Sequence, residues 1–519
     1  MILRGFGIAL LCAVCLPLVA RANPEPPATY DARVTGMGGV AVATVDSAAA
    51  LFHNPAQLDR IERFAVTAVA TSLLVNLRAP FAGPGTEEES GLIYAPLLFF
   101  GAVGRVHERV SLGAGAYVYT GFGGGFPTVE CITYGDPSAC GSATEPNVVY
   151  DPPVAEEVTL FIAELAVPIQ VTLIPEVLSA GVTLRMPYGR QAVNATQEAL
   201  GAWSQAEQSL DGFGVPGVLL GLSYRPIPAL TIAAAYRSKV WVDMEGTTSV
   251  PFAGETLEIP TTTRWYVPHA FRFGLAYTTW RDRLTLTGEF RVQLHREANR
   301  LQRFDLEPDA ALARLVPDTE ARFDWGNVFF GGVAAEVWVL PRFPVRVGLT
   351  VANSASDPNT MTPFSPPPGV MIGAYGGAGV RLGGLEVDFA FGWGGGPAYD
   401  KKDNGDLCTP ASERTRRDGA GQILTASGGC AGSYDVDSWF MSLSVTYRVG
   451  HAPEPAEPLL PISQPAEPTS EPVEPVEPVA AEPVAEPTSE PAEPVAAEPT
   501  EASGGVVEDA PGPTLGTDG

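Results

Sequence analysis

The sequence predicts an all-β protein: a transmembrane antiparallel β-barrel of about 14 strands, with an N-terminal plug (hatch) in its lumen. Three observations lead to this fold class. Short segments alternate between apolar and polar residues, and the links between them alternate between tight turns and long loops. After residue 22, no apolar run approaches the ~20 residues that a membrane-spanning helix needs.

The alternation has a period of two, which is the period of a β-strand. In "LEVDFAFGW" (385–393), Leu, Val, Phe and Trp share one face, while Glu, Asp, Ala and Gly share the other. "FRFGLAYT" (271–278) and "LTLTGEFRVQLH" (284–295) repeat the pattern. A soluble β-sandwich alternates in the same way, so the choice between the two classes depends on the connections.

The connections favour the barrel, because short turns at one end and long loops at the other are typical of outer-membrane barrels. Tight turns are expected at "VHER", "IPEV", "PIP", "RDR", "PRFP" and "GG". They alternate with loops at 77–91, 122–155, 190–211, 243–263, 298–323, 356–368 and 396–435. An even strand number closes the sheet and leaves no unpaired edge in lipid. We expect the long loops outside, and the turns and both termini in the periplasm.

The first 22 residues have the pattern of a secretory signal peptide. Arg4 precedes an apolar run, Pro17 interrupts that run, and Ala20-Arg21-Ala22 forms a small-x-small end. We therefore expect domains at 1–22 (signal peptide), 23–62 (hatch), 63–450 (barrel) and 451–519 (tail). An exported barrel of this kind belongs in the bacterial outer membrane, in contact with outer-membrane lipid.

Four of the six cysteines follow the signal peptide, namely Cys131, Cys140, Cys408 and Cys430. They form two close pairs in the sequence, without Cys-x-x-Cys and without histidines at metal-ligand spacing. An oxidising compartment favours disulfides over metal sites. The simplest pairing is 131–140 and 408–430, each inside one outer loop.

The C-terminal 69 residues have a different composition from the rest. They hold 15 acidic residues and no Lys or Arg, and proline recurs every few positions. Such a segment cannot form a packed core, so a disordered, extended spacer is expected. The chain carries a net charge of −27, which argues against nucleic acid as a partner.

The stretch "GMGGVAVATVDSAAALFHNPAQL" (36–58) lies just before the first predicted strand. Asp46 or Ser47 is expected to cap a short helix, and Pro55 to end it by forcing Asn54 out of helical angles. Gly36, Gly38 and Gly39 permit a tight turn or a close approach to a wall. Its small apolar residues have nothing nearby in sequence to pack against, so we expect a plug in the periplasmic half of the lumen.

This stretch resembles the start of the FadL-type family of outer-membrane transporters for long-chain fatty acids and aromatic hydrocarbons. The resemblance rests on Gly36-x-Gly38-Gly39, Asp46, and Asn54-Pro55-Ala56, and it agrees with the strand count. It implies a hatch gated by these seven residues. It also implies a lateral gap at a kinked strand, for which "GGAGV", "FFGGV" and "SLGAGAYVYTGFGGGF" are candidates.

The function expected from this resemblance is passive uptake of a hydrophobic small molecule. In the alternative, the barrel is an assembly platform whose acidic tail binds a periplasmic protein or the cell wall. Phe126, Trp203, Phe252 and Phe364 are candidates for a capture surface in the outer loops. No Gly-x-Ser-x-Gly or Ser–His pairing accompanies the histidines, so we expect no enzyme activity, no catalytic residue, no cofactor and no metal.

Overall fold

The computed structural model describes residues 30–81, 85–133, 147–199, 202–252, 255–308, 319–402, 415–417, 423–425 and 429–450. The predicted signal peptide and tail, and the residues Cys140 and Cys408, lie outside these ranges. Within the described ranges, no helix is long and apolar enough to cross a membrane.

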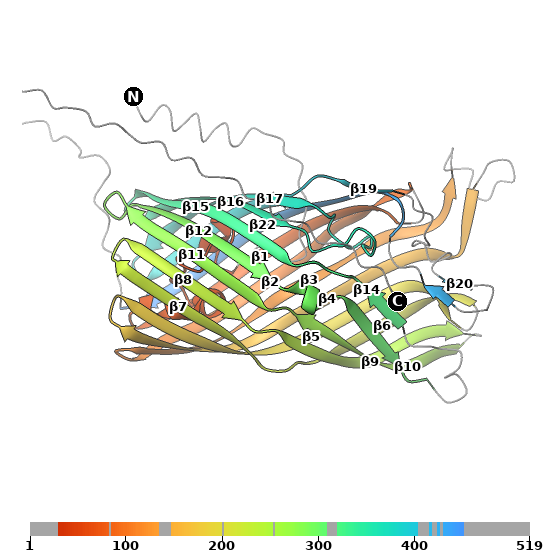
Figure 1. Ribbon diagram of the computed structural model, residues 1–519, viewed down its shortest axis with the longest axis horizontal. Coiled ribbons are helices and arrows are strands. Elements are labelled where there is room, and N and C mark those ends of the chain that lie inside the picture. Colours follow the sequence, from red (N-terminus) through yellow and green to blue (C-terminus); the bar gives the residue numbers. More distant parts are fainter. Residues whose placement is uncertain are drawn as a thin grey trace, which may run out of the picture. The chain divides into compact units, whose positions relative to one another are not determined.

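All described strands except β20 and β21 form one antiparallel sheet, which closes into a 14-strand barrel (Figure 1). The first and last strands close it, because β1 pairs with β2 on one edge and with β22 on the other. Nine positions in the wall are single strands: β1 (Phe64–Pro80), β2 (Glu87–His107), β3 (Val110–Thr133), β4 (Asn147–Ile174), β5 (Leu178–Ala199), β16 (Phe343–Asn353), β17 (Val370–Leu382), β18 (Leu385–Gly395) and β22 (Gly432–Val449).

The five other positions consist of two strands each, separated by a short interruption. They are β6 (Ala202–Phe213) with β7 (Gly217–Ile227), β8 (Leu230–Arg237) with β9 (Val240–Phe252), β10 (Glu255–Val267) with β11 (Ala270–Thr279), β12 (Leu284–Gln293) with β13 (Leu301–Leu306), and β14 (Thr319–Arg322) with β15 (Val328–Leu340). Three short strands lie beyond the wall: β19 (Tyr399–Lys401) pairs with β22, and β20 (Thr415–Arg417) pairs with β21 (Ile423–Thr425).

The predicted strand number and class are therefore confirmed, but four predicted loops are wrong. Most of 77–91, 122–155, 190–211 and 243–263 is strand, because β1, β2, β3, β4, β5, β6, β9 and β10 extend beyond the predicted ends. These extensions are polar and rich in threonine, as in "TTSVPF". A strand outside the hydrocarbon layer needs no apolar face, so hydropathy does not reveal it.

The apolar side chains of the wall point outward. On β11, Phe273 and Leu275 are 51% and 54% exposed, whereas Arg272, which precedes Phe273 and points to the other face, is only 8% exposed. The same arrangement holds on β16, where Val347 and Leu349 are exposed and Arg346 is buried. An apolar outer face with polar groups inside is the pattern of a barrel that faces lipid.

Residues 30–61, here called the luminal segment, lie inside the barrel and appear red in Figure 1. They form α2 (Ala32–Gly36), α3 (Ala50–His53) and the 3₁₀ helix η1 (Pro55–Arg60); a further 3₁₀ helix, η3 (His295–Glu297), follows β12. Asp31 caps α2 by accepting a hydrogen bond from the Arg33 amide at 2.9 Å. Gly38 and Gly39 then adopt positive φ of 70° and 81°, which glycine tolerates best.

The predicted capping of α3 is wrong, while its predicted end is confirmed. α3 begins at Ala50 without a side-chain cap, and the hydroxyl of Ser47 accepts from the Ala49 amide instead. The carboxylate of Asp46 forms ion pairs with Arg33 and Arg448 instead. Asn54 is extended (φ −161°), as expected before Pro55, and its Oδ1 accepts from the Ala56 amide to start η1.

Candidate functional site: the lumen and its openings

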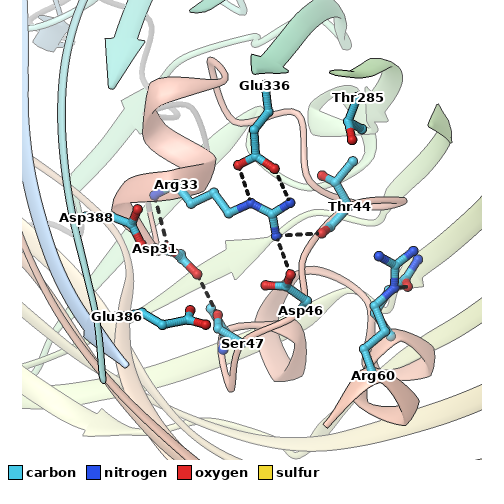
Figure 2. Close-up of polar contacts among 12 residues, drawn as sticks. Asp31, Arg33, Thr44, Asp46, Ser47, Arg60, Thr285, Glu336, Glu386 and Asp388 are labelled. Carbon is cyan, nitrogen blue, oxygen red and sulfur yellow. Dashed lines mark hydrogen bonds and ion pairs between the residues drawn. The ribbon is translucent and has the colours of Figure 1, made fainter. Parts of the chain in front are cut away.

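Asp46 is part of a cluster of charges between the luminal segment and the wall (Figure 2). Arg33 of α2 makes a two-pronged contact with Glu336 of β15, with both N–O distances at 2.8 Å. Its remaining nitrogen lies 2.7 Å from the carboxylate of Asp46 and donates to the Thr44 carbonyl. A two-pronged guanidinium–carboxylate contact fixes orientation as well as distance.

The cluster continues around the wall and returns to its starting point. Glu336 also contacts Arg346, which contacts Asp388 at 2.6 Å. Asp388 contacts Arg381, which approaches Glu386 at 3.6 Å. The circuit closes through Arg448, which lies 2.8 Å from Glu386 and 3.1 Å from Asp46. We call these four arginines and four carboxylates the charge ring: Arg33, Asp46, Glu336, Arg346, Arg381, Glu386, Asp388 and Arg448.

The pKa of Asp46, the most exposed member of the ring, is set by the arginines beside it. The side chain of Asp46 keeps 32% of its surface, against 13% or less for the other seven members. Burial alone raises the pKa of Asp46, but Arg33 and Arg448 outweigh burial and hold the pKa well below its ordinary value. Asp46 therefore stays ionised at neutral pH, and the ring is neutral as a whole.

A polar cavity of about 320 Å³ borders the charge ring at the turn end of the barrel. It is lined by ring members Arg33, Asp46, Arg381, Glu386 and Arg448, and by Arg60 and the residues around the start of β1. We call this cavity the vestibule. Arg60 donates hydrogen bonds to Gln57, to the Ala43 carbonyl and to Thr231. Since Arg60 is the last residue of η1, the vestibule also reaches the C-terminal end of the luminal segment.

Asn54, Pro55 and Ala56 meet the wall in a different way. The side-chain nitrogen of Asn54, Nδ2, donates hydrogen bonds to the backbone carbonyls of Val42 (2.9 Å) and of Leu222 on β7 (3.2 Å). A Cβ on Gly221 would lie 2.1 Å from the Asn54 side-chain oxygen, and one on Gly181 would lie 2.6 Å from the Pro55 backbone. The motif is thus packed against two glycines of the wall.

The end of η1 is fixed by a second carboxylate. Asp59 forms an ion pair with Arg225 of β7 and accepts a hydrogen bond from the Ser179 hydroxyl on β5. The Asp59 carbonyl also accepts from Arg105 of β2. Only residues 61–63 separate η1 from β1, so this end of the luminal segment is also covalently close to the wall.

Aromatic and charged side chains of the wall pack around α3 in the lumen. Glu164 on β4 is fully buried and binds Arg185, Arg237 and the Tyr117 hydroxyl. The Arg237 guanidinium lies over the ring of Tyr119, 4.1 Å from its centroid. Phe52 of α3 packs edge-on against Tyr117. At this level of the lumen, side chains of the luminal segment therefore pack against side chains of the wall.

His53 is buried beside a cation. One ring nitrogen, Nε2, lies 2.8 Å from the Tyr30 carbonyl and must donate to it, so Nδ1 is free to accept from Arg272 at 3.2 Å. Burial lowers the pKa of His53, and repulsion from Arg272 lowers it further. The imidazole is therefore neutral at physiological pH.

Above this blocked layer, the wall contains an opening between β2 and β3. Backbone pairing of these strands runs from His107–Val110 to Phe99–Tyr117 and ends there. Beyond that point, within the described residues, β2 pairs only with β1, and β3 pairs only with β4. The register of β3 against β4 shifts at Tyr119, between Val118 and Thr120, so β3 bends where its pairing with β2 ends.

The opening leads into a cavity of about 690 Å³, the largest of those described here. Its lining combines inward residues such as Leu97 and Phe440 with outward residues such as Tyr94 and Leu98, so the cavity reaches the outer face of the wall. Gly121, Gly123, Gly124 and Gly125 of β3 line the opening. A Cβ on Gly124 would lie 2.5 Å from Ile93 and 3.4 Å from Leu77, both of which also line the cavity.

Phe440 lines both this cavity and a smaller chamber of about 50 Å³. The chamber mixes apolar side chains with the polar groups of Arg291, Thr350 and Tyr375. Two of its lining residues, Thr350 and Tyr375, also contact the luminal segment, since a Cβ on Gly38 would lie 2.7 Å from the Thr350 methyl and 3.0 Å from the Tyr375 ring.

The predicted capture aromatics have different surroundings. Phe126 is buried; its ring stacks on that of Phe81, with 4.7 Å between the ring centroids, and meets the ring of Phe364 edge-on at 5.4 Å. Phe364 in turn lines the large cavity. The side chains of Trp203 and Phe252 lie outside the described residues, as do those of Cys131, Cys140 and Cys408. Cys430 is disulfide-bonded, and its pairing with Cys408 stays a prediction.

No family model matches the sequence, and no curated protein matches it. Solved structures do match. A FadL homologue from Pseudomonas aeruginosa is 15% identical, with a TM-score of 0.63 and coverage of 82% of this chain and 100% of that one. The toluene transporter TbuX of Ralstonia pickettii is 14% identical (TM-score 0.57, 81% and 98% covered), and TodX of P. putida is 13% identical (0.58, 81% and 99%).

The fold and the lumen define a β-barrel whose interior is occupied by its own N-terminal residues and whose wall opens to one side. It is the fold of the FadL homologue and the toluene transporters, shared over nearly their whole length. Sequence reasoning picked out Gly36, Gly38, Asp46, Asn54 and Pro55, but missed the six charge-ring residues on the wall. The only signal for these was acidic and basic residues on the small-residue faces of strands such as "LEVDFAFGW".

Proposed function

We propose that the protein is a bacterial outer-membrane transporter for the passive uptake of hydrophobic molecules, such as long-chain fatty acids or aromatic hydrocarbons. The observation that carries the proposal is the large cavity that passes through the wall between β2 and β3. A closed structural barrel has no use for an interruption in its backbone pairing, since each unpaired group in lipid costs free energy.

The comparisons support the same class of function. Two of the matching structures are toluene transporters, and the matches span almost all of each of those chains. An apolar ligand gains roughly 25 cal/mol for each Å² that it removes from water, so a cavity of this kind retains it without an energy source. The exposed apolar residues of the wall face outer-membrane lipid, and the opening then connects this lipid with the cavity.

In this proposal, residues 23–62 are the hatch that keeps the lumen closed to water. Gly36, Gly38 and Gly39 let α2 end against the wall, and Asp46 holds the hatch to Arg448. Asn54, Pro55 and Ala56 hold it to β5 and β7. The ligand is captured among the outer loops, enters the cavity, and leaves through the β2–β3 opening.

A substitution at Gly124 tests the proposal. Gly124→Phe places a ring against Ile93 and Leu77, so that Ile93 has to shift and the opening narrows. We expect uptake of radiolabelled toluene and oleate by producing cells to fall at least tenfold. Gly376→Phe is the matched control, because a Cβ at that position meets nothing closer than 3.9 Å. Equal uptake by the two variants, with both barrels folded, would refute transport through this cavity.

A further inference from the structure

We infer that the large cavity selects uncharged apolar molecules over carboxylates, and that Glu157 of β4 sets this preference at the opening in the wall. The inference deepens the proposed function and rests on it, because it takes the large cavity as the place where the cargo binds. It separates the two classes of cargo named there: neutral hydrocarbons are preferred, and ionised fatty acids are disfavoured.

The first argument is the charge of the lining. Among the described residues that line the large cavity there is no Lys, Arg or His, and Glu157 is the only acidic residue. An ionised carboxylate that enters an apolar space without meeting a cation loses its hydration and gains no partner, which is costly. A hydrocarbon has no charge to desolvate, so the same transfer is favourable for it.

The hydroxyl groups of the lining offer little in place of a cation. Ser90 donates to the Gly91 carbonyl and accepts from the Leu77 amide. The hydroxyls of Thr362 and Ser365 lie 3.2 Å apart and bond to each other, and that of Ser365 also accepts from the Thr362 amide. These groups are therefore largely engaged by the protein itself, and a carboxylate would have to compete for them.

Two arginines that adjoin the cavity are already paired. Arg78 follows a lining residue in the sequence, and it lies 3.4 Å from Glu87. Arg291 lines the small chamber, which shares Phe440 with the large cavity, and it lies 3.1 Å from Glu289. A carboxylate on the cargo would have to displace a carboxylate of the protein from either arginine.

The second argument is the position of Glu157, which follows from the register of β3 against β4. Three glycines of β3 each pair with a cavity-lining side chain of β4: Gly121 with Phe161, Gly123 with Thr159, and Gly125 with Glu157. Because glycine has no side chain, the residues of β4 form this edge of the opening. The side chain of Glu157 lies against Gly125, where a Cβ would be 3.4 Å from its Cγ.

The surroundings of Glu157 keep its charge effective. The residue is exposed, so its carboxylate stays hydrated at the edge of the cavity. In a partly hydrated opening of this kind, repulsion between two like charges a few Å apart weakens binding roughly tenfold. Glu157 therefore acts against an anionic head group at the point where the cavity meets the outer face of the wall.

Two probes with the same chain and different head groups test the inference. Radiolabelled oleyl alcohol is neutral, whereas oleate is fully ionised at about pH 9. We would measure how much of each probe the purified full-length protein retains in one nonionic detergent, and compare the oleate-to-alcohol ratio between variants. Comparing ratios removes the difference in solubility between the probes. Glu157→Gln deletes the charge with little change of shape, and Glu157→Arg reverses it.

Relative to the wild type, the ratio is expected to rise several-fold in Glu157→Gln and at least tenfold in Glu157→Arg. The matched control is Glu258→Arg, which makes the same change of net charge. Glu258 is likewise an exposed glutamate of the wall, on β10, and it is not among the residues that line the cavity. The ratio in this control should stay within twofold of the wild-type value.

An unchanged ratio in the folded Glu157 variants would overturn the inference, and so would an equal rise in the Glu258 control, which would assign the effect to net charge. Neither result would touch the proposed function, which the uptake test at Gly124 decides separately. If the wild type retains neither probe, the proposed function fails, and the charge preference fails with it.

Discussion

The two arms of the luminal segment meet the same wall through different chemistry. The N-terminal arm, residues 31–46, is held by the charge ring, next to the polar vestibule. The C-terminal arm, residues 54–60, is held by close backbone packing on Gly181 and Gly221 and by one buried ion pair. The difference shows that the wall holds the two ends of one segment by different means: a balanced network of ion pairs at one end, and close packing on glycine at the other.

The largest effect is expected when the ring is unbalanced. Glu336→Gln leaves Arg33 and Arg346 without their shared carboxylate, and breaking a buried ion pair typically costs about 3–5 kcal/mol. Urea titration of the refolded barrel in lipid vesicles measures this loss. The control is Glu320→Gln, whose partner Arg303 is 68% exposed, so the loss there should stay below about 1 kcal/mol. Similar losses in both variants would show that the ring contributes no more than a surface pair.

A smaller effect is expected when the motif of the C-terminal arm is removed. Asn54→Ala/Pro55→Ala deletes the hydrogen bonds to Val42 and Leu222 and should cost about 1–3 kcal/mol of local stability. Hydrogen exchange over residues 48–60 should speed up, and uptake should fall, while the heat-modifiable band of the folded barrel persists on a gel. Loss of that band would mean that the motif is needed for folding rather than for closing the lumen.

The smallest effect is a pH dependence confined to the middle of the segment. The pKa of His53 is lower in the folded protein than in the unfolded chain, so its contribution to stability is complete above the unfolded value of ~6.5 and declines as the pH falls below it. The protection factors of residues 50–54, which are exchange rates corrected for the intrinsic rate at each pH, should therefore fall by at most about tenfold per pH unit between pH 6.5 and 5. His53→Gln should remove this dependence; an equal fall in that variant would assign it to another group.

The sequence predicted the barrel, its strand number and the special backbone of the luminal segment, because period-two alternation, glycines and the Asn-Pro step are local signals. Gly38 and Asn54 have the backbone geometry expected from their neighbours. The charge ring was not predictable in this way, since its wall members lie between Glu336 and Arg448 on five strands and meet only when the barrel closes. The β2–β3 opening depends likewise on where pairing stops, although the glycines of "GFGGGF" marked its position.

The central claim is that the large cavity holds an apolar ligand, and mass spectrometry of molecules retained by the purified barrel tests it most directly. Wild-type protein and Gly124→Phe would be extracted in the same detergent and their bound small molecules compared. We expect a fatty acid or hydrocarbon that is retained by the wild type and lost from the variant. An equal content of apolar molecules in both preparations, or none in either, would contradict it.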